Sequence, residues 1–236
     1  FTVKCQNATG GWRYVPFTND SDMSVTVCQI VALRAARNVG IKVPRATIDR
    51  ALTYIIQSAI AENDHPPGPK GAYWYQPFDK RFNRPSFALC AAGLTAMFQA
   101  GLYDDDQVRA HIKRFKIRRR SPPPSISDSV DFMDNAYWQV WHRRGHMGPD
   151  HYFYYYGNYY GAQAMYQIGG RDMARWRSWY SRVRDHLLER MNPIKTAEGK
   201  TQAFWRSNVD ETNAYATACA LLILQFPLDY LPIHQR

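Results

Sequence analysis

The fold is decided by two neighbouring stretches, Gly10-Gly11-Trp12-Arg13-Tyr14 and Asp22-Met23-Ser24-Val25-Thr26. The first predicts a glycine turn with an aromatic strip. The second predicts a helix start, because Asp22 or Ser24 can accept hydrogen bonds from the free amides there. The next residues share one helical face before a stop at Gly40, and they are Val27, Ile30, Val31 and Ala35. A second amphipathic pattern, and with it a helical hairpin, follows from Ile48, Leu52, Ile55 and Ile56.

Further helices are predicted along the rest of the chain. Helical patterns cover 86–100, 128–144, 171–191 and 212–224, Asp104-Asp105-Asp106 opens another helix, and an aromatic helix has Tyr152-Phe153-Tyr154-Tyr155-Tyr156 at its start. We expect the helix over 171–191 to bury Trp176, Trp179, Val183, Leu187 and Leu188. Residues 62–85 are rich in Pro and Gly and predict a linker, whereas the polar residues 192–211 predict a long loop.

The first hairpin resembles the repeat of the prenyltransferase and squalene-cyclase superfamily. The likeness rests on Gly-Gly-Trp-x-Tyr, on Asp-x-Ser-x-Thr and on the helix that carries Ala32-Leu33, and it returns at 154–170 and 215–233. It is a likeness to bacterial proteins known only by that repeat. The resemblance implies an all-α fold, an α/α toroid of inner and outer helices, in one domain over residues 1–236. The toroid would be a shortened ring or the C-terminal part of a longer one.

Terpenoid cyclases of this superfamily carry an Asp-x-Asp-Asp motif, whose middle carboxylic acid protonates an alkene or an epoxide. In the register of the helix, the motif falls on Asp22-Met23-Ser24-Val25 and keeps only its first Asp. In the register of the acids, it falls on Asp20-Ser21-Asp22-Met23 and lacks only the last Asp, but the helix is then displaced by two residues. The resemblance thus offers Asp22, together with Asp20, as a catalytic acid, while the eroded motif weighs against this activity.

Protein prenyltransferases of the superfamily hold Zn²⁺ with an Asp, a Cys and a His. Here Ser24 stands at the Cys position, and Asp150-His151-Tyr152 matches the His element only loosely, so the resemblance argues against that site. A separate, weak metal candidate combines His142, His146, Asp150 and His151. Because Gly145 interrupts the helical face that His142 and His146 would share, we favour loop histidines and expect no metal and no cofactor.

Aromatic residues make up 14% of the chain, with 16 Tyr and 7 Trp. These two side chains combine a large apolar body with one polar atom, which suits a semi-polar cavity and also suits packing between helices. In a toroid, a ligand cavity for an isoprenoid or another apolar molecule would be lined by Trp12, Tyr14, Trp74, Tyr155, Tyr156 and Tyr159. Packing against neighbouring helices is the alternative for most of them.

A net charge of +10 favours anionic partners. One basic run could contact an acidic protein subunit or lipid headgroups, and it contains Lys113, Arg114, Lys116, Arg118, Arg119 and Arg120. The alternative, which we favour, is the solvated end of a helix. No RRM, KH or zinc-finger pattern supports nucleic-acid binding, and no apolar run is long enough to span a bilayer. The compartment stays open, since a soluble, peripheral, exported or periplasmic protein would all fit.

The chain has four cysteines, and none has CxxC spacing. Cys28, Cys90 and Cys219 lie within apolar helical patterns, where we expect buried thiols that behave as small hydrophobic groups.

Two functions of different classes follow from the residues and the resemblance. The leading hypothesis is a toroid without catalysis that acts as a binding or structural subunit, for a protein partner or for an apolar, isoprenoid-like ligand. The alternative is a terpenoid cyclase of the squalene type, or a prenyltransferase-like enzyme, with Asp22 as its acid. The first is preferred because the scaffold is kept while both catalytic motifs are eroded.

Overall fold

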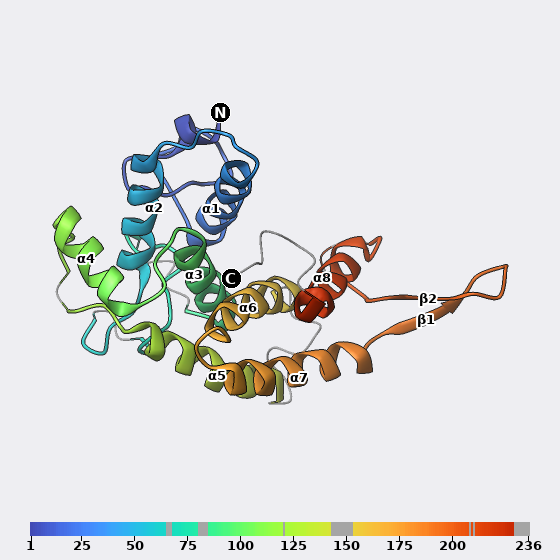
Figure 1. The fold of residues 1–236 in the computed structure, drawn as a ribbon. Helices are drawn as coiled ribbons and strands as arrows, with labels where there is room; N and C mark the ends of the chain where they lie inside the picture. Colours follow the sequence, from blue (N-terminus) through green and yellow to red (C-terminus); the bar gives the residue numbers. More distant parts are fainter. Residues whose placement is uncertain are drawn as a thin grey trace. The chain divides into compact units, whose positions relative to one another are not determined.

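A computed structural model describes residues 1–64, 68–79, 85–119, 121–142, 153–207, 209 and 211–228, with the backbone alone for 136–142. The chain divides into two compact units, unit 1 over Phe1–Ala136 and unit 2 over Tyr137–Arg236. The described residues form α-helices and one two-stranded sheet, so the prediction of an all-α fold is confirmed apart from this small sheet (Figure 1).

Unit 1 is built from a short 3-10 helix and the first α-helices of the chain. These elements are η1 (Thr2–Cys5), α1 (Met23–Asn38), α2 (Arg45–Ser58), α3 (Phe87–Gln99), α4 (Asp105–Phe115) and the first part of α5 (Ile126–His142). Helix α1 packs on α2 and α3, and α2 also packs on α3 and α4. Every residue of α3 is buried, and its sequence is apolar or small on all sides except at its last residue, Gln99. The predicted first hairpin is therefore confirmed as α1 and α2.

The helix starts are set by short polar side chains. Asp22 caps α1 by accepting from the amide of Val25, and Asp104 caps α4 in the same way. Ser86 caps α3, and in unit 2 Asp172 caps the helix over Met173–Glu189. The prediction that either Asp22 or Ser24 caps α1 is thus resolved in favour of Asp22.

Two glycine turns in unit 1 make the same close approach to a later helix. Gly10 has φ +94° and Gly71 has φ +86°, a backbone conformation that favours glycine. A Cβ added to Gly10 would lie 2.3 Å from the carbonyl oxygen of Arg50 in α2. A Cβ added to Gly71 would lie 2.3 Å from the carbonyl oxygen of Asp128 in α5. Both turns therefore require glycine for conformation and for space.

Unit 2 is a smaller helical group with a β-hairpin. Its elements are α6 (Tyr154–Ile168), α7 (Met173–Glu189), β1 (Asn192–Lys195), β2 (Thr201–Phe204), α8 (Ala214–Gln225) and η3 (Phe226–Leu228). Helix α6 packs on α7 and α8. The buried face of α7 is confirmed for Trp176, Trp179, Val183 and Leu187. The prediction for Leu188 is wrong, because this side chain is 47% exposed on the neighbouring face.

The predicted long loop over 192–211 is also wrong in part, because it contains the antiparallel hairpin β1–β2. Asn192 pairs with Phe204 and Lys195 with Thr201. Gly199, with φ +76°, helps the chain to turn. The hairpin extends beyond the helices of unit 2 (Figure 1). The residues of both strands are exposed or half-buried. The strands therefore lack the alternation of apolar and polar residues from which a strand can be predicted.

A tryptophan makes the same two kinds of hydrogen bond before α1 and before α8, one from its backbone amide and one from its indole. The amide of Trp12 donates to Oγ1 of Thr26, and the amide of Trp205 donates to Oγ1 of Thr217, each over 3.1 Å. The two indole Nε1 atoms also donate to backbone carbonyls, Trp12 to Thr2 over 2.8 Å and Trp205 to Leu187 over 2.7 Å. Each buried tryptophan thus ties the segment before a helix to a residue inside that helix.

All four cysteines are free thiols, and the expectation of burial is wrong for Cys28. Cys28 is exposed, whereas Cys5, Cys90 and Cys219 are buried. Burial raises the pKa of Cys219 to about 11 and raises that of Cys90 further. Both groups therefore stay as unreactive thiols near neutral pH.

We expect rapid modification of Cys28 alone when the folded protein meets a thiol reagent at neutral pH. The buried thiols should react at least about a hundredfold more slowly, because reaction needs both access and the thiolate. Peptide mapping after timed labelling measures this order. Labelling of Cys90 as fast as Cys28 in the folded protein would contradict the burial described here.

Candidate functional site

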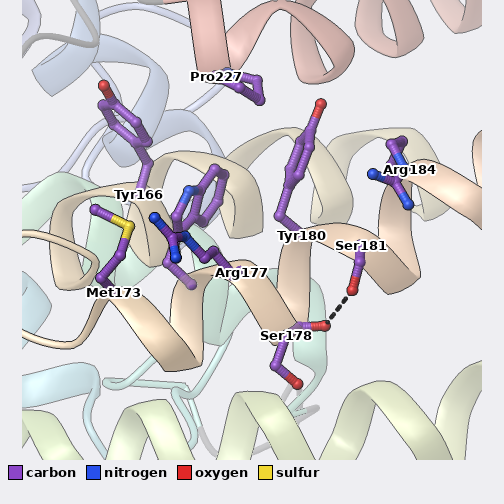
Figure 2. Close-up of a pocket in the computed structure, with 9 residues that line it drawn as sticks. Tyr166, Met173, Arg177, Ser178, Tyr180, Ser181, Arg184 and Pro227 are labelled. Carbon is purple, nitrogen blue, oxygen red and sulfur yellow. Dashed lines mark hydrogen bonds between the residues drawn. The ribbon is translucent and has the colours of Figure 1, made fainter.

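A groove of about 800 Å³ lies in unit 2 along α7 (Figure 2). One stripe of α7 provides Met173, Arg177, Tyr180 and Arg184, which recur every three or four residues and so share a helical face. The remaining lining residues are Tyr166 from α6, Trp176, Ser178 and Ser181 from α7, and Pro227 from η3. The volume falls in the range of ordinary ligand pockets, about 300–1,000 Å³.

The apolar wall of the groove is rigid because its rings contact one another. The ring centroids of Trp176 lie 5.3 Å from Tyr166 and 4.9 Å from Tyr180. The hydroxyl of Tyr180 donates to the carbonyl of Leu224 at the end of α8, over 3.1 Å. Burial raises the pKa of Tyr180, so the phenol keeps this proton at neutral pH. The aromatic side chains are therefore held in place before a ligand arrives.

Two arginines supply positive charge to the same groove. Arg184 pairs with its neighbour Asp185 over 2.7 Å, at the surface. Arg177 is exposed and makes no ion pair with a described residue. Sequence reasoning missed this site, although the spacing of Met173, Arg177, Tyr180 and Arg184 could have indicated a mixed aromatic and basic stripe. The arrangement can bind an apolar or aromatic body next to an anionic group.

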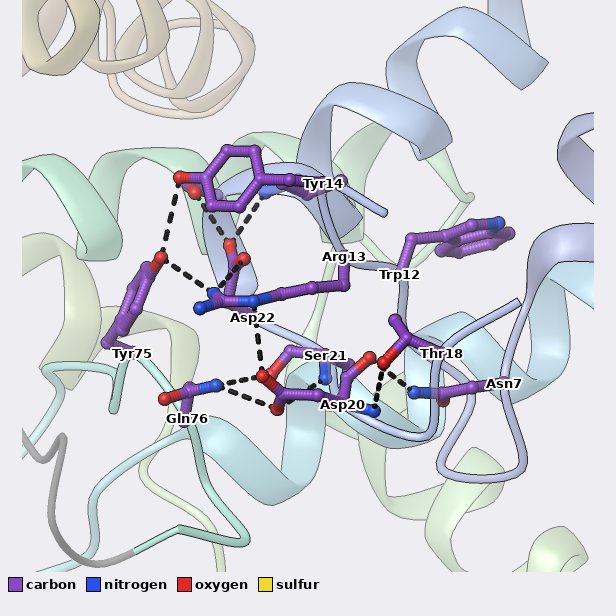
Figure 3. A network of polar contacts seen from close by, with 12 residues as sticks. Asn7, Trp12, Arg13, Tyr14, Thr18, Asp20, Ser21, Asp22, Tyr75 and Gln76 are labelled. Atoms are coloured by element: carbon purple, nitrogen blue, oxygen red, sulfur yellow. Dashed lines mark hydrogen bonds and ion pairs between the residues drawn. The ribbon is translucent and has the colours of Figure 1, made fainter. Parts of the chain in front are cut away.

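Asp22, the predicted acid, is fully buried in unit 1, and both of its carboxylate oxygens have partners (Figure 3). Its Oδ1 accepts from the amide of Val25 over 2.9 Å and from Oγ of Ser24 over 2.6 Å. Its Oδ2 pairs with the guanidinium of Arg13 over 2.6 Å. All these partners donate to the carboxylate, and they match a helix cap with a compensating charge.

Arg13 connects Asp22 to Asp20, the other predicted acid, and to Tyr75 (Figure 3). Its Nε pairs with Oδ2 of Asp20 over 3.1 Å, and its guanidinium donates to the hydroxyl of Tyr75 over 3.0 Å. Burial lowers the pKa of Arg13, but the hydrogen bonds to Asp22 and Tyr75 outweigh it and raise that pKa above its ordinary value. Burial, with the contact to Tyr14, raises the pKa of Tyr75 to about 12. The cluster is thus a charged arginine between two carboxylates.

The predicted cavity residues fall into both units. In unit 1, Trp12 and Trp74 are buried, while Tyr14 is 69% exposed. Trp74 packs with Ile60 and Ala72. Both tryptophans therefore have structural roles, Trp12 through the hydrogen bonds of its backbone amide and indole, and Trp74 through its packing in the core.

In unit 2, Tyr155 is buried, and Tyr156 and Tyr159 are half-buried. The rings of Tyr156 and Tyr159 both pack edge to face against Tyr160, at centroid distances of 4.7 and 5.2 Å. The ring of Tyr155 packs instead against Tyr154 and Tyr215. None of the six predicted cavity residues lines the α7 groove. The cavity they were expected to form stays a prediction.

Only part of the predicted basic run is exposed to solvent. Lys113, Arg114, Lys116 and Arg118 are exposed, and Arg120 lies outside the described residues. Arg119 departs from the expectation, because its guanidinium turns inward to the end of α2. It donates to the carbonyls of Ile56 and Ala59, the latter over 2.6 Å, and pairs with Asp64 over 3.2 Å. Burial lowers the pKa of Arg119.

Arg119 turns inward because the end of α2 offers it carbonyl acceptors. The last carbonyl groups of a helix lack partners within it, and a guanidinium can satisfy several of them at once. Arg119 is therefore a positioning residue for α2 and is not available to an anionic partner in the described structure.

The weak metal candidate is not placed by the structure. His146, Asp150 and His151 lie outside the described residues, as does the side chain of His142. Within the part of the chain that is described, no group of three His, Cys, Asp or Glu side chains could hold a metal ion. The described helices also include none with the length and apolar composition needed to cross a membrane.

Comparison of the chain with protein-family models, with curated proteins and with solved structures finds no match. The α7 groove and the Asp22 cluster are therefore the features that bear on function.

Proposed function

We propose that the chain is a non-catalytic binding domain, whose α7 groove holds a ligand with an apolar body and an anionic head. An isoprenoid phosphate has this chemistry. The observation that carries the proposal is the stripe of α7, where Met173 and Tyr180 alternate with Arg177 and Arg184 along one groove. The apolar chain would lie against Trp176 and its neighbouring rings, and the head would accept from the two guanidinium groups.

We also propose that the helices are hairpins of the α/α toroid type. Two pairs of matched contacts support this interpretation. The tryptophan-to-threonine bond is the same before α1 and before α8, and the turns at Gly10 and Gly71 approach a later helix in the same way. Matched contacts at separate places in one chain are expected of a structural repeat.

The cyclase alternative is less favoured because of how Asp22 is bonded. A general acid must carry a proton and reach the substrate, which requires surroundings that keep the carboxyl group neutral. Asp22 is buried, accepts from two donors and pairs with Arg13, so both of its carboxyl oxygens are already engaged within unit 1. These contacts support a structural carboxylate.

Titration with farnesyl phosphate, farnesol and inorganic phosphate tests the proposed function. We expect saturable binding of farnesyl phosphate in isothermal titration calorimetry, with much weaker binding of the other two. Arg177→Ala should weaken binding by about tenfold, since it removes one charge-assisted hydrogen bond. The charge-matched control is Arg182→Ala, on the same helix but outside the groove, and it should leave the affinity unchanged.

Two results would overturn the proposal. The first is equal weakening by Arg177→Ala and Arg182→Ala, which would show that only the net charge of α7 matters. The second is no saturable binding of farnesyl phosphate by the folded protein, which would leave a structural subunit as the better hypothesis.

A further inference from the structure

The turn that joins α1 to α2 in unit 1 holds two large apolar side chains out in solvent. This turn, which we call the α1–α2 tip, has the sequence Val39-Gly40-Ile41-Lys42-Val43-Pro44. Val39 is 77% exposed and Ile41 is 59% exposed. A Cβ built on Gly40, between them, would meet no atom within 4 Å, so the outer side of the turn is open. Two β-branched apolar side chains thus project together from one turn.

The backbone of the tip is fixed by hydrogen bonds at the end of α1. The amide of Gly40 donates to the carbonyl of Arg37 over 3.0 Å, and the amide of Ile41 donates to the carbonyl of Ala36 over 2.9 Å. This is the Schellman pattern, and Gly40 has the left-handed φ of +85° that it requires. The residue in the place of Ile41 commonly packs on the preceding helical turn, where this chain has only the small Ala36. The exposure of Ile41 is therefore built into a well-bonded turn.

The chain around the tip carries only positive charge. No Asp or Glu occurs between Asp22 and Asp49. The basic residues of that stretch are Arg34, Arg37, Lys42 and Arg45. Arg37 and Lys42 are exposed, and neither forms an ion pair with a described residue. One cation therefore stands just before Val39, and another directly follows Ile41.

The other two basic residues are partly engaged, and α4 adds further charge beside them. Arg34 donates to a carbonyl of α3 over 3.3 Å, and Arg45 pairs with Asp49 over 2.9 Å. Burial lowers the pKa of His111 in α4, and the charges of Arg45 and Arg114 act in the same direction, while Asp49 opposes them. Arg114 therefore lies close to the start of α2, and the basic end of α4 strengthens the positive field there.

We propose that the α1–α2 tip inserts Val39 and Ile41 into the surface of an anionic lipid bilayer, with Arg37 and Lys42 among the headgroups. Apolar side chains beside basic ones match the two layers of such a surface, acyl chains below and phosphates above. Long basic side chains can keep their charges at the phosphates while their stems lie against the apolar layer. Insertion costs little at the backbone, because the amides of Gly40 and Ile41 already have partners within the turn.

A lipid surface fits the tip better than a protein or a nucleic acid does. A stable protein interface buries about 800 Å² and about 20–30 residues on each partner, which a projecting turn cannot provide. Nucleic acids are bound through their phosphates and by stacking of their bases on aromatic rings, which leaves Val39 and Ile41 without a role. A bilayer accepts a small apolar tip because its lipids rearrange around the inserted side chains.

Cosedimentation with vesicles tests this inference, using the whole chain and lipids that include no isoprenoid. At about 0.1 M salt we expect saturable binding to phosphatidylcholine vesicles that contain about one quarter phosphatidylglycerol. Binding to phosphatidylcholine alone should be at least about tenfold weaker. Val39→Ser and Ile41→Ser should each weaken binding by about tenfold, since each removes one apolar side chain from the acyl layer. Lys42→Gln should weaken it by about fivefold.

The dipeptide Ile194-Lys195 in β1 offers a matched control for Ile41-Lys42. Ile194 is 49% exposed and Lys195 is also exposed, but they lie on a strand of unit 2. Ile194→Ser and Lys195→Gln make the same changes of side chain and of charge, and they should leave vesicle binding unchanged. Circular dichroism should show the helical content of the unchanged chain in every variant, because all the replaced side chains are exposed.

Three results would overturn the inference. Equal weakening by Ile41→Ser and Ile194→Ser would show that the tip is not the part of the chain that enters the bilayer. Equal weakening by Lys42→Gln and Lys195→Gln would show that only the net charge matters. No saturable binding to the anionic vesicles would leave the tip as an exposed turn. None of these results bears on the binding of farnesyl phosphate, so this inference and the function proposed for the α7 groove succeed or fail separately.

Discussion

Gly71→Ala is expected to destabilise unit 1 by about 3–4 kcal/mol, because the new methyl group meets a backbone atom that cannot turn aside. The Cβ would lie 2.3 Å from the carbonyl oxygen of Asp128 and 2.9 Å from the amide of Ser129, at the start of α5. The turn or the helix would have to shift. Urea unfolding, followed by circular dichroism, measures the loss.

Gly101→Ala is the matched control for this prediction. Gly101 has φ +93°, close to the +86° of Gly71, but a Cβ there would meet no atom within 4 Å. It should cost only the strain of a left-handed residue, about 1–2 kcal/mol. The difference between the two variants isolates the contact with α5. Equal losses would show that the turn at Gly71 does not press against Asp128.

Asp22→Ala is expected to destabilise unit 1 by about 3 kcal/mol, through the loss of both the cap and the ion pair. Arg13 would keep a partner in Asp20 but lose Asp22, and the amide of Val25 would lose its acceptor. Asp22→Asn should cost only about 1–2 kcal/mol, because an amide oxygen can still cap α1. Urea unfolding of both variants measures this order.

Asp172→Ala gives the comparison, because Asp172 also caps a helix but lies at an exposed site, and it should cost about 1 kcal/mol. If Asp22 served only as a catalytic acid, Asp22→Ala would leave stability unchanged. That outcome would revive the cyclase hypothesis and would contradict the structural role argued here.

Much of the fold could be predicted from local patterns. The apolar spacing over 27–35 and over 48–56 predicted α1 and α2, and Asp104 predicted the start of α4, because capping and amphipathicity act over a few residues. The hairpin β1–β2 could not be predicted in this way, since its strands are exposed and depend on pairing with each other.

The candidate sites were predicted less well, because they depend on residues far apart in the sequence. Asp22 and Asp20 were singled out as acids, yet their partner Arg13 also contacts Tyr75, which comes from a different strip of the chain. The basic run was recognised, but burial of Arg119 against the end of α2 depends on where that helix ends in space.

The sequence by itself determined the helical class, the hairpin of α1 and α2 and the glycine turn before it, because these follow from short-range geometry and from the chemistry of single residues. Only the tertiary structure decided which polar groups meet. It set Gln76 beside Asp20 and Ser21, and it brought Tyr166 and Pro227 to the arginine stripe of α7. The physical reason is that a binding site needs several side chains within a few ångströms, and packing between distant segments decides that proximity.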